Sequence, residues 1–252
     1  MLDKIYIARH GFRLNWVNNN WVAPTGLARD APLAAYGETQ ADQLAKYFLS
    51  LPEEDRPTLI ASSPYYRCLQ TAAPTSRALA TPIFVESGLS ECLIQYFPDV
   101  IDAAAWPESL YLPPRVGEDV AELHQRAKTF LDVFIPTVER AFPEHKRILL
   151  VSHAATVIVL TRALLGEPDL PIRVGCCSVT EIVRKPGGAA LGGWEAKKLA
   201  DGAHLPEGAS REWGIEDIEV AQGRVVEDPG VPGTENEEDG PNGVQIPLSS
   251  NL

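Results

Sequence analysis

Short apolar runs alternate with amphipathic stretches along the first 183 residues of the chain. Runs at 5–8, 58–61, 83–85 and 147–151 have the length of buried strands, and the β-branched run at 178–183 predicts one more. The run at 147–151 is the strongest of them. The first four end abruptly in polar residues, which predicts strands that deliver side chains to one edge of a sheet.

Helical patterns lie between these runs. Residues 37–51 carry apolar or small side chains at helical spacing, and residues 118–142 form a long amphipathic pattern. Ser62-Ser63-Pro64 predicts another helix start, with Ser as the N-cap and Pro in the first turn. A fourth helix is expected to end at Gly166. This alternation predicts an α/β fold, a three-layer, largely parallel sheet with helices on both faces.

Three segments depart from the alternation. Residues 14–30, rich in Asn, Trp and Gly, predict a loop over the strand ends. Residues 92–114 are irregular and contain several prolines, which predicts a functional loop or lid. Residues 194–205 predict a pair of strands joined by a turn at Asp201-Gly202.

Charged and imidazole side chains stand where the predicted strands end. Arg9 and His10 follow the first run, Arg67 lies just past the second, and Glu91 and His153 follow the third and fourth. Ligands of open α/β sheets bind outside the carboxyl ends of the strands, so these side chains are expected to meet. Guanidinium groups hold phosphate oxygens, and a neutral imidazole is a nucleophile towards phosphorus. On residues 9–13 alone, a basic surface turn is the alternative.

Composition narrows the classes of function. The 252 residues, 45% of them apolar, suffice for one large domain with a full core, or at most two small domains. With 34 Asp and Glu against 22 Lys and Arg, the formal net charge is -12. This balance argues against direct binding of nucleic acid, which favours a basic face. A phosphate site therefore has to be a local positive pocket in a negative molecule.

The acidic excess is concentrated near the end of the chain. Residues 227–252 contain six Asp and Glu and no Lys or Arg, among many Gly, Pro and Asn. We predict one domain over residues 1–226, with its core at about 1–183 plus a C-terminal strand region. The acidic tail over 227–252 is predicted to be disordered.

Cysteine usage and hydropathy indicate the compartment. The four cysteines form no CxxC pair, which predicts reduced thiols in an intracellular protein. The N-terminus lacks the apolar segment of a secretory signal, and no run reaches membrane-spanning length. We expect a cytoplasmic or nuclear protein that does not bind membranes.

The motifs at the strand ends resemble a known family. Arg9-His10-Gly11, residues 62–68 and Ser152-His153-Ala154 resemble the histidine phosphatase superfamily, whose fold is phosphoglycerate-mutase-like. The resemblance covers about residues 1–183. Within this family, the chain is similar to a fungal branch at residues 9–16, 63–69 and 194–213. That branch contains the 55 kDa subunit of transcription factor IIIC (tau55) and free-standing phosphatase-like proteins.

The resemblance implies a catalytic constellation without metal or organic cofactor. His10 would attack phosphorus and carry the phosphoryl group as phosphohistidine, while Arg9 and Arg67 clamp the phosphate oxygens. His153, as imidazolium, would neutralise the charge that develops during transfer. Glu91 would be the general acid, which requires a raised pKa, and then the base for the attacking water.

Two further residues are expected at the substrate. Arg13 matches an additional Arg of phosphatase branches and should bind phosphate. Asn15 would steady the site by hydrogen bonds, and a plain loop role is equally open. Glu86 is an alternative to Glu91, and an Arg67 that reaches out from its helix to solvent is the alternative to a phosphate ligand.

Four histidines can also be interpreted as ordinary structural residues. His153 could be a core histidine satisfied by the backbone, although its pairing with Arg-His-Gly favours catalysis. His124, His145 and His204 have the pattern of ordinary helix or loop residues, and no role is expected for them.

Three functions fit these features. A phosphomonoesterase acting on a phosphorylated small molecule or phosphopeptide is favoured. A phosphoglycerate-type mutase needs a lid that keeps water from the phosphohistidine, and no clear mutase lid pattern is present. The third is an interaction module with a protein partner in the transcription factor IIIC machinery. The tau55 family carries a long C-terminal extension, whereas this chain ends at Leu252, which favours the free-standing enzyme.

Overall fold

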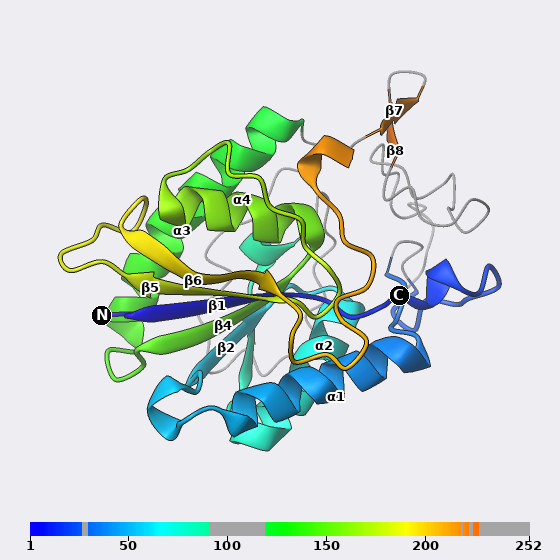
Figure 1. The fold of residues 1–252 in the computed structure, drawn as a ribbon, viewed down its shortest axis with the longest axis horizontal. Helices are drawn as coiled ribbons and strands as arrows, with labels where there is room; N and C mark the ends of the chain where they lie inside the picture. The colour runs from blue at the N-terminus through cyan, green and yellow to red at the C-terminus, as the bar shows by residue number, and fades with distance from the viewer. Residues whose placement is uncertain (27–29, 91–118, 218, 222–223, 227–252) are drawn as a thin grey trace.

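The computed structural model describes residues 1–26, 30–90, 119–217, 219–221 and 224–226. Its centre is a six-stranded sheet with the order β3-β2-β4-β1-β5-β6 (Figure 1). The strands are β1 (Lys4–Arg9), β2 (Leu59–Ser62), β3 (Ile83–Val85), β4 (Arg147–Ser152), β5 (Val179–Arg184) and β6 (Trp194–Asp201). A separate pair consists of β7 (Glu219–Ala221) and β8 (Arg224–Val226).

Of the six strands in this sheet, β5 alone runs against the other five. β1 pairs in parallel with β4, β4 with β2, and β2 with β3. β5 lies antiparallel to β1, and β6 lies antiparallel to β5. The prediction of a largely parallel sheet is confirmed, and the carboxyl ends of β1 and β4 meet because Arg9 is opposite Ser152.

Helices cover both faces of the sheet, as predicted. α1 (Ala35–Ser50) and α2 (Tyr66–Leu79) lie on one face, and α3 (Val120–Ala141) and α4 (Ala154–Leu165) lie on the other (Figure 1). Short 3₁₀ segments are η1 (Leu14–Trp16), η2 (Glu53–Asp55), η3 (Ser87–Leu89) and η5 (Ile215–Asp217). The predicted helix at 118–142 begins with a capping box, in which the side chain of Asp119 accepts from the backbone of Glu122.

The three layers enclose two apolar cores. Alternate side chains of a strand point to opposite faces, so Ile5 and Ile7 pack with α3 and α4, while Tyr6 and Ala8 pack with α1 and α2. β4 is fully buried from Ile148 onward. Such burial on both faces is what continuous apolar strands of a parallel sheet require.

Two local predictions were wrong. Ser62 is the last residue of β2, and α2 begins at Tyr66 with Tyr65 as its N-cap, without a side-chain cap. Ser63 and Pro64 therefore connect the strand and the helix. The segment 194–205 contains one strand, β6, which ends at Asp201 and pairs with β5 rather than with a strand after the turn.

Two predicted segments lie outside the described residues, namely the lid at 92–114 and the tail at 227–252. None of the described helices is long and apolar enough to cross a membrane. Cys68, Cys176 and Cys177 are buried free thiols.

Candidate active site

Two histidines face each other where β1 and β4 end. His10 directly follows β1, and His153 directly follows β4 as the N-cap of α4. The backbone N–H of His10 donates to the carbonyl of Ser152 at 2.9 Å, which continues the parallel pairing by one residue. The two rings therefore lie edge to face with their centroids 5.4 Å apart. Residues 143 positions apart thus meet at one point.

The hydrogen bond of His10 fixes its tautomer. Nδ1 of this 2% exposed side chain lies 2.7 Å from the carbonyl oxygen of Gly11. A carbonyl only accepts, so Nδ1 carries the hydrogen and Nε2 holds the lone pair. Burial, followed by the charges of Arg67 and Arg9, holds the pKa of His10 well below its ordinary value of 6.5. His10 is therefore a neutral imidazole with a nucleophilic Nε2 at neutral pH.

The loop after His10 is held by a close backbone approach to α1. A Cβ on Gly11 would lie 2.7 Å from the carbonyl oxygen of Gly37, and one on Gly37 would lie 2.2 Å from that of Phe12. Only glycine allows this contact. The hydroxyl of Thr71 on α2 accepts from the N–H of Gly11 at 3.0 Å, and Gln40 on α1 accepts from the N–H of Phe12.

Arg67 lies inside the site rather than in solvent. It is the second residue of α2, and only 1% of it is exposed. Its guanidinium stacks on the ring of Tyr65 and lies 3.7 Å from the carboxylate of Asp30. Burial raises the pKa of Asp30, and the Arg67 charge opposes that rise. Asp30 also accepts from the N–H of Tyr66 at 2.8 Å, so it orients the first turn of α2.

The ring of His153 is hydrogen-bonded on both nitrogens. Nη2 of Arg67 lies 3.2 Å from Nδ1, and the hydroxyl of Ser63 lies 2.9 Å from Nε2. A guanidinium only donates, so Nδ1 accepts and Nε2 carries the hydrogen. In this arrangement His153 is neutral, whereas the resemblance implied an imidazolium. A proton on Nδ1 requires Arg67 to turn away from it.

Three arginines surround Trp16 next to His10. The guanidinium carbons of Arg13, Arg211 and Arg9 lie 4.5, 4.7 and 5.7 Å from the Trp16 ring. The indole centroid is 6.2 Å from that of His10. Such stacking is a favourable cation–π geometry, and it concentrates positive charge at the mouth of the site.

Backbone carbonyls fix the direction of Arg9. Its Nη1 donates to the carbonyl of Val174 at 2.8 Å and also to that of Arg211. Arg211 has a positive φ of 53°, which is strained for a side chain of its kind. A non-glycine residue is held in this conformation only when the surrounding contacts require it. The segment around residue 211 is thus part of the site.

The remaining predicted residues differ in their placement. Asn15 is 6% exposed, and its Oδ1 has no hydrogen-bond partner within the described part of the chain. Glu86, fully buried after β3, accepts from the backbone N–H of Gly88 at 3.0 Å. Glu91 lies outside the described residues. The structure therefore brings together Arg9, His10, Arg13, Arg67 and His153, and it does not place Glu91.

Sequence reasoning missed the contributions of Asp30, Ser63, Gly37 and Arg211. Each acts on the site from a distant segment, so no local motif marks it. The positive charge and irregular context of Arg211 were the available signals, but many surface residues share them.

The described residues also bear on cysteine chemistry and on metal binding. Burial raises the pKa of the Cys177 thiol well above its ordinary value, so this nearby sulfur stays protonated and is a poor nucleophile. Among the described residues, no group of three or more His, Cys, Asp or Glu side chains has the arrangement of a metal site.

The fold and the paired histidines agree with a family that the sequence itself identifies. The sequence model of the histidine phosphatase superfamily (branch 1) matches residues 5–197, so the chain belongs to this family. The family predicted from the motifs is confirmed.

Relatives of several kinds share this family. The chain is 37% identical over 215 residues to the transcription factor tau 55 kDa subunit of Saccharomyces cerevisiae. This match covers 73% of the chain, which spans 48% of that relative. A probable phosphoglycerate mutase of Proteus mirabilis is 28% identical, over 81% of this chain and 95% of its own length.

Solved structures with the same fold include phosphatases. A mycobacterial glucosyl-3-phosphoglycerate phosphatase superposes with a TM-score of 0.54 and 21% identity, over 77% of this chain and 97% of that one. A phosphoserine phosphatase mutant of Entamoeba histolytica, in complex with phosphoserine, superposes with a TM-score of 0.53 and 20% identity. This match covers 80% of this chain and 98% of that one. At these identities the likeness shows the fold alone.

Proposed function

We propose that the chain is a phosphatase that hydrolyses a phosphate monoester through a phosphohistidine on His10. The observation that carries this proposal is the state of that ring. It is buried, neutral, and fixed by Gly11 with its lone pair on Nε2, within a group of guanidiniums. A nucleophile towards an anionic phosphate needs this combination, because the cations offset the charge of the substrate while the ring keeps its lone pair.

The first step transfers the phosphoryl group. Nε2 of His10 forms a bond to phosphorus as the bond from phosphorus to the ester oxygen breaks. Arg9, Arg13 and Arg67 hold the phosphoryl oxygens and stabilise their charge. Arg67 leaves Nδ1 of His153 to bind the phosphate. That nitrogen takes up a proton from solvent, donates to a phosphoryl oxygen, and gives the proton back to solvent when phosphate leaves.

Glu91 handles the protons of both steps, and the second step releases phosphate. In the first step Glu91 gives its proton to the ester oxygen, so the alcohol leaves neutral. Glu91 then accepts a proton from the water that attacks phosphorus, and the bond to Nε2 breaks. Asn15 offers its unpaired carbonyl oxygen to a hydroxyl or ammonium group of the substrate. Inorganic phosphate leaves and His10 returns to its neutral form. No metal or cofactor takes part.

Arg211 supplies a charge beyond those needed for the phosphoryl group. Its guanidinium stacks on Trp16 and on Phe12, at 4.7 and 5.6 Å. Its described surroundings provide no carboxylate ion pair. We assign it to a second anionic group, such as a carboxylate, carried by a small phosphorylated substrate or a phosphopeptide.

The test is the release of inorganic phosphate from an aryl phosphate by the purified chain. Turnover is expected between mildly acidic and neutral pH, with the loss of at least three orders of magnitude in His10→Ala because the nucleophile is gone. Acid quenching with a labelled substrate should trap a phosphohistidine in the wild type only. Turnover equal to that of His10→Ala throughout this range would refute the proposal.

Glutamate variants separate the two candidate acids. Glu91→Gln should lower kcat strongly for alkyl phosphates and less for aryl phosphates, whose leaving groups need no proton. Glu86→Gln should not show this dependence on the leaving group. The reverse result would transfer the acid role to Glu86.

A second candidate is favoured by the 37% identity to the yeast tau 55 kDa subunit. In this case the domain serves as a weakly catalytic or non-catalytic scaffold for a protein partner in the transcription factor IIIC machinery. Retention of transcription factor IIIC subunits by the tagged chain, together with absent phosphatase activity, would favour the scaffold function.

Isomerisation of a phosphoglycerate in a coupled assay would instead favour a mutase. We expect the chain in the cytoplasm or the nucleus.

A further inference from the structure

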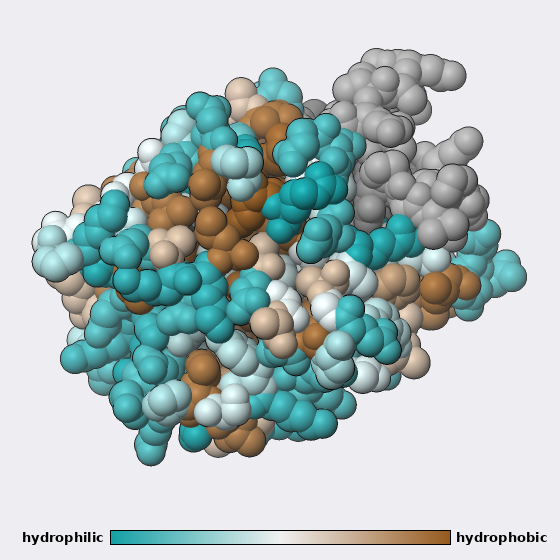
Figure 2. Space-filling model, viewed as in Figure 1, coloured by the Kyte–Doolittle hydropathy of each residue, from teal (hydrophilic) through white to brown (hydrophobic). Residues whose placement is uncertain are grey.

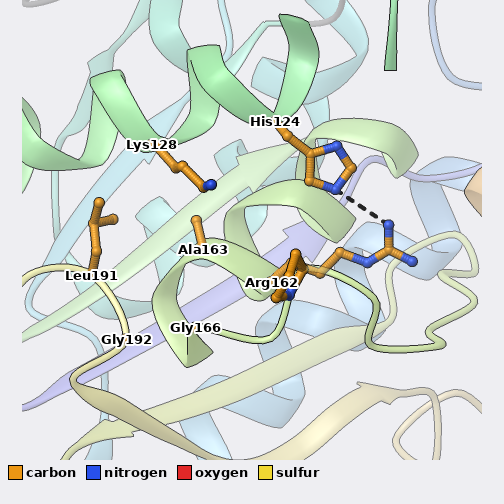
Figure 3. Close-up of a pocket in the computed structure, with 8 residues that line it drawn as sticks. His124, Lys128, Arg162, Ala163, Gly166, Leu191 and Gly192 are labelled. Atoms are coloured by element: carbon orange, nitrogen blue, oxygen red, sulfur yellow. Dashed lines mark hydrogen bonds between the residues drawn. The ribbon is translucent and has the colours of Figure 1, made fainter. Parts of the chain in front are cut away.

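A second basic pocket lies away from the paired histidines. It encloses about 280 Å³ between α3, the end of α4 and the turn before β6. Figure 3 shows His124 and Lys128 on α3, Arg162 and Ala163 on α4, and Leu191 and Gly192 on the turn. Arg162 is nine residues beyond His153, or about 14 Å along the helix at 1.5 Å per residue. The pocket is therefore separate from the site at the strand ends.

The charges in this pocket are all of one sign. Its eight described lining residues include Lys128, Arg162 and His124, and none is acidic. No ion pair joins Lys128 or Arg162 to a carboxylate in the described part of the chain, although the protein has a net charge of -12. Two unneutralised cations in one recess of an acidic protein indicate an anionic occupant.

The guanidinium of Arg162 is built into the pocket wall. Arg162 is 9% exposed, and its Nε donates to the carbonyl of Leu170 at 3.0 Å. Its Nη1 lies 3.3 Å from Nε2 of His124, whose Nδ1 lies 2.7 Å from the carbonyl of Val120. Nδ1 therefore donates and Nε2 accepts, so His124 orients Arg162 as a neutral ring. Nη2 makes no hydrogen bond within the described residues and remains available as a donor.

Lys128 completes the pair of donors. It stands one turn after His124 on α3, and its ammonium points across the recess towards Ala163 (Figure 3). Around these donors the lining is apolar or lacks a side chain, with Ala163, Pro168 and Leu191 beside Gly166 and Gly192. Figure 2 likewise shows apolar residues gathered over the α3 and α4 side of the molecule.

We propose that this pocket binds a small organic phosphate, with the phosphate at the ammonium of Lys128 and the organic part against Ala163 and Leu191. A phosphate monoester dianion is attracted by the positive charges of Lys128 and Arg162, and its oxygens accept from the ammonium. A volume of about 280 Å³ admits a ligand of small-metabolite size but not a folded domain. The pocket contains no paired imidazoles, so the ligand is bound without being hydrolysed.

The experiment uses phenylphosphonate, a dianion with an apolar ring and a carbon–phosphorus bond that a phosphatase does not cleave. Amide NMR of the full chain reports the two sites separately, through Gly166 and Gly192 at the pocket and through Gly11 beside His10. We expect saturable shifts at Gly166 and Gly192. Lys128→Gln should weaken this binding about tenfold by removing a charge-assisted contact, and should leave the titration of Gly11 unchanged.

Two variants provide controls. Lys46→Gln removes an exposed lysine from α1, on the other face of the sheet, and should leave both titrations unchanged. Lys128→Arg keeps the charge and should retain binding within about threefold. The proposal is overturned if Gly166 and Gly192 do not shift, if chloride at equal ionic strength shifts them equally, or if Lys128→Gln binds as wild type does. Because no turnover is measured, these outcomes do not depend on whether His10 is catalytic.

Discussion

Keeping His10 neutral makes the folded protein less stable at acidic pH, and this loss can be measured. Burial and the nearby guanidiniums hold its pKa well below 6.5, whereas the same ring in the unfolded chain takes up a proton near pH 6.5. Below pH 6.5 the unfolded state therefore binds more protons, and the free energy of unfolding falls as the pH falls. Above pH 6.5 both states are neutral and this contribution vanishes.

Replacing His10 with Asn should remove this acid sensitivity. We expect His10→Asn to lose less stability than the wild type between pH 7 and pH 5, by at most about 1.4 kcal/mol per pH unit. Urea unfolding at pH 5, 6 and 7 measures the difference. His145→Asn, which changes a histidine outside the site, should follow the wild type. Parallel curves for wild type and His10→Asn would show that the ring is not held neutral.

Arg211 should determine which phosphates are preferred. We expect Arg211→Gln to lower kcat/KM for phosphoserine, which carries a carboxylate, at least tenfold more than for an aryl phosphate, since about 1.5–3 kcal/mol of charge-assisted binding is lost. Initial rates on both substrates measure this ratio. Arg173→Gln, which removes a surface ion pair with Asp217, should leave it unchanged. Equal losses on both substrates would instead mean that Arg211 only supports Arg9 through its carbonyl.

Single residues were predictable from the sequence where they stood directly at a strand end. His10 and His153 follow apolar runs, so strand geometry alone places them at one sheet edge. Asp30 and Arg211 could not be found in this way, because their contacts depend on how irregular segments fold back over that edge. The hydroxyl of Ser63 was misassigned to a helix cap, and it lies 2.9 Å from the ring of His153.

At the level of elements, hydrophobic periodicity was a reliable guide wherever an element is buried on both faces or is amphipathic. β4 and α3 were predicted within two residues at each end. β6 was misjudged because pairing partners are set by the sheet and not by the turn chemistry near residue 201. The start of α2 was misjudged because the first turn is oriented by Asp30 from another segment.

The contact between α1 and the loop after β1 predicts a sensitive position. A Cβ at Gly37 would lie 2.2 Å from the carbonyl oxygen of Phe12, so Gly37→Ala must push α1 away from that loop. We expect a loss of about 2 kcal/mol or more in unfolding free energy, of the size that overpacking produces, and a fall in activity because the Gly11 carbonyl moves. Urea unfolding and phosphatase assays measure both effects.

A change elsewhere on the same helix provides the comparison. Glu38 is the next residue of α1 and is exposed. Glu38→Ala should alter stability by no more than about 0.5 kcal/mol and leave turnover intact. If Gly37→Ala behaves as Glu38→Ala does, the helix tolerates displacement and the close approach is not required.

For the whole molecule, a ligand at the strand ends should stabilise every part of the fold together. The candidate site draws on β1, α2, α4 and residue 211, so an oxyanion held there binds only the folded chain. At vanadate concentrations 100 times its Kd, the free energy of unfolding should rise by about 2.7 kcal/mol. Arg67→Met should abolish most of this rise, and Arg173→Gln should keep it. An unchanged midpoint in the wild type at saturation would refute an oxyanion site.

Fold class and family were predictable from the sequence, since both follow from element order and from motifs at strand ends. The division into a domain at 1–226 and a tail at 227–252 remains a prediction based on composition. Charge at this scale also explains why the proposed phosphate sites are local. In a molecule of net charge -12, a phosphate is attracted only where cations outnumber the acidic side chains around them.

The placement of β1 in the sheet has a consequence for biosynthesis. β1 is made before both of the strands that pair with it, which are β4 at Lys4↔Arg147 and β5 at Lys4↔Val183. At about 5–20 residues per second, the ribosome takes roughly 10 to 40 s between making β1 and making β5. During that interval β1 lacks the strand that pairs with it on one side. Arg9 lacks the carbonyl of Arg211 for longer still, so the candidate site is completed only after that later segment has been made.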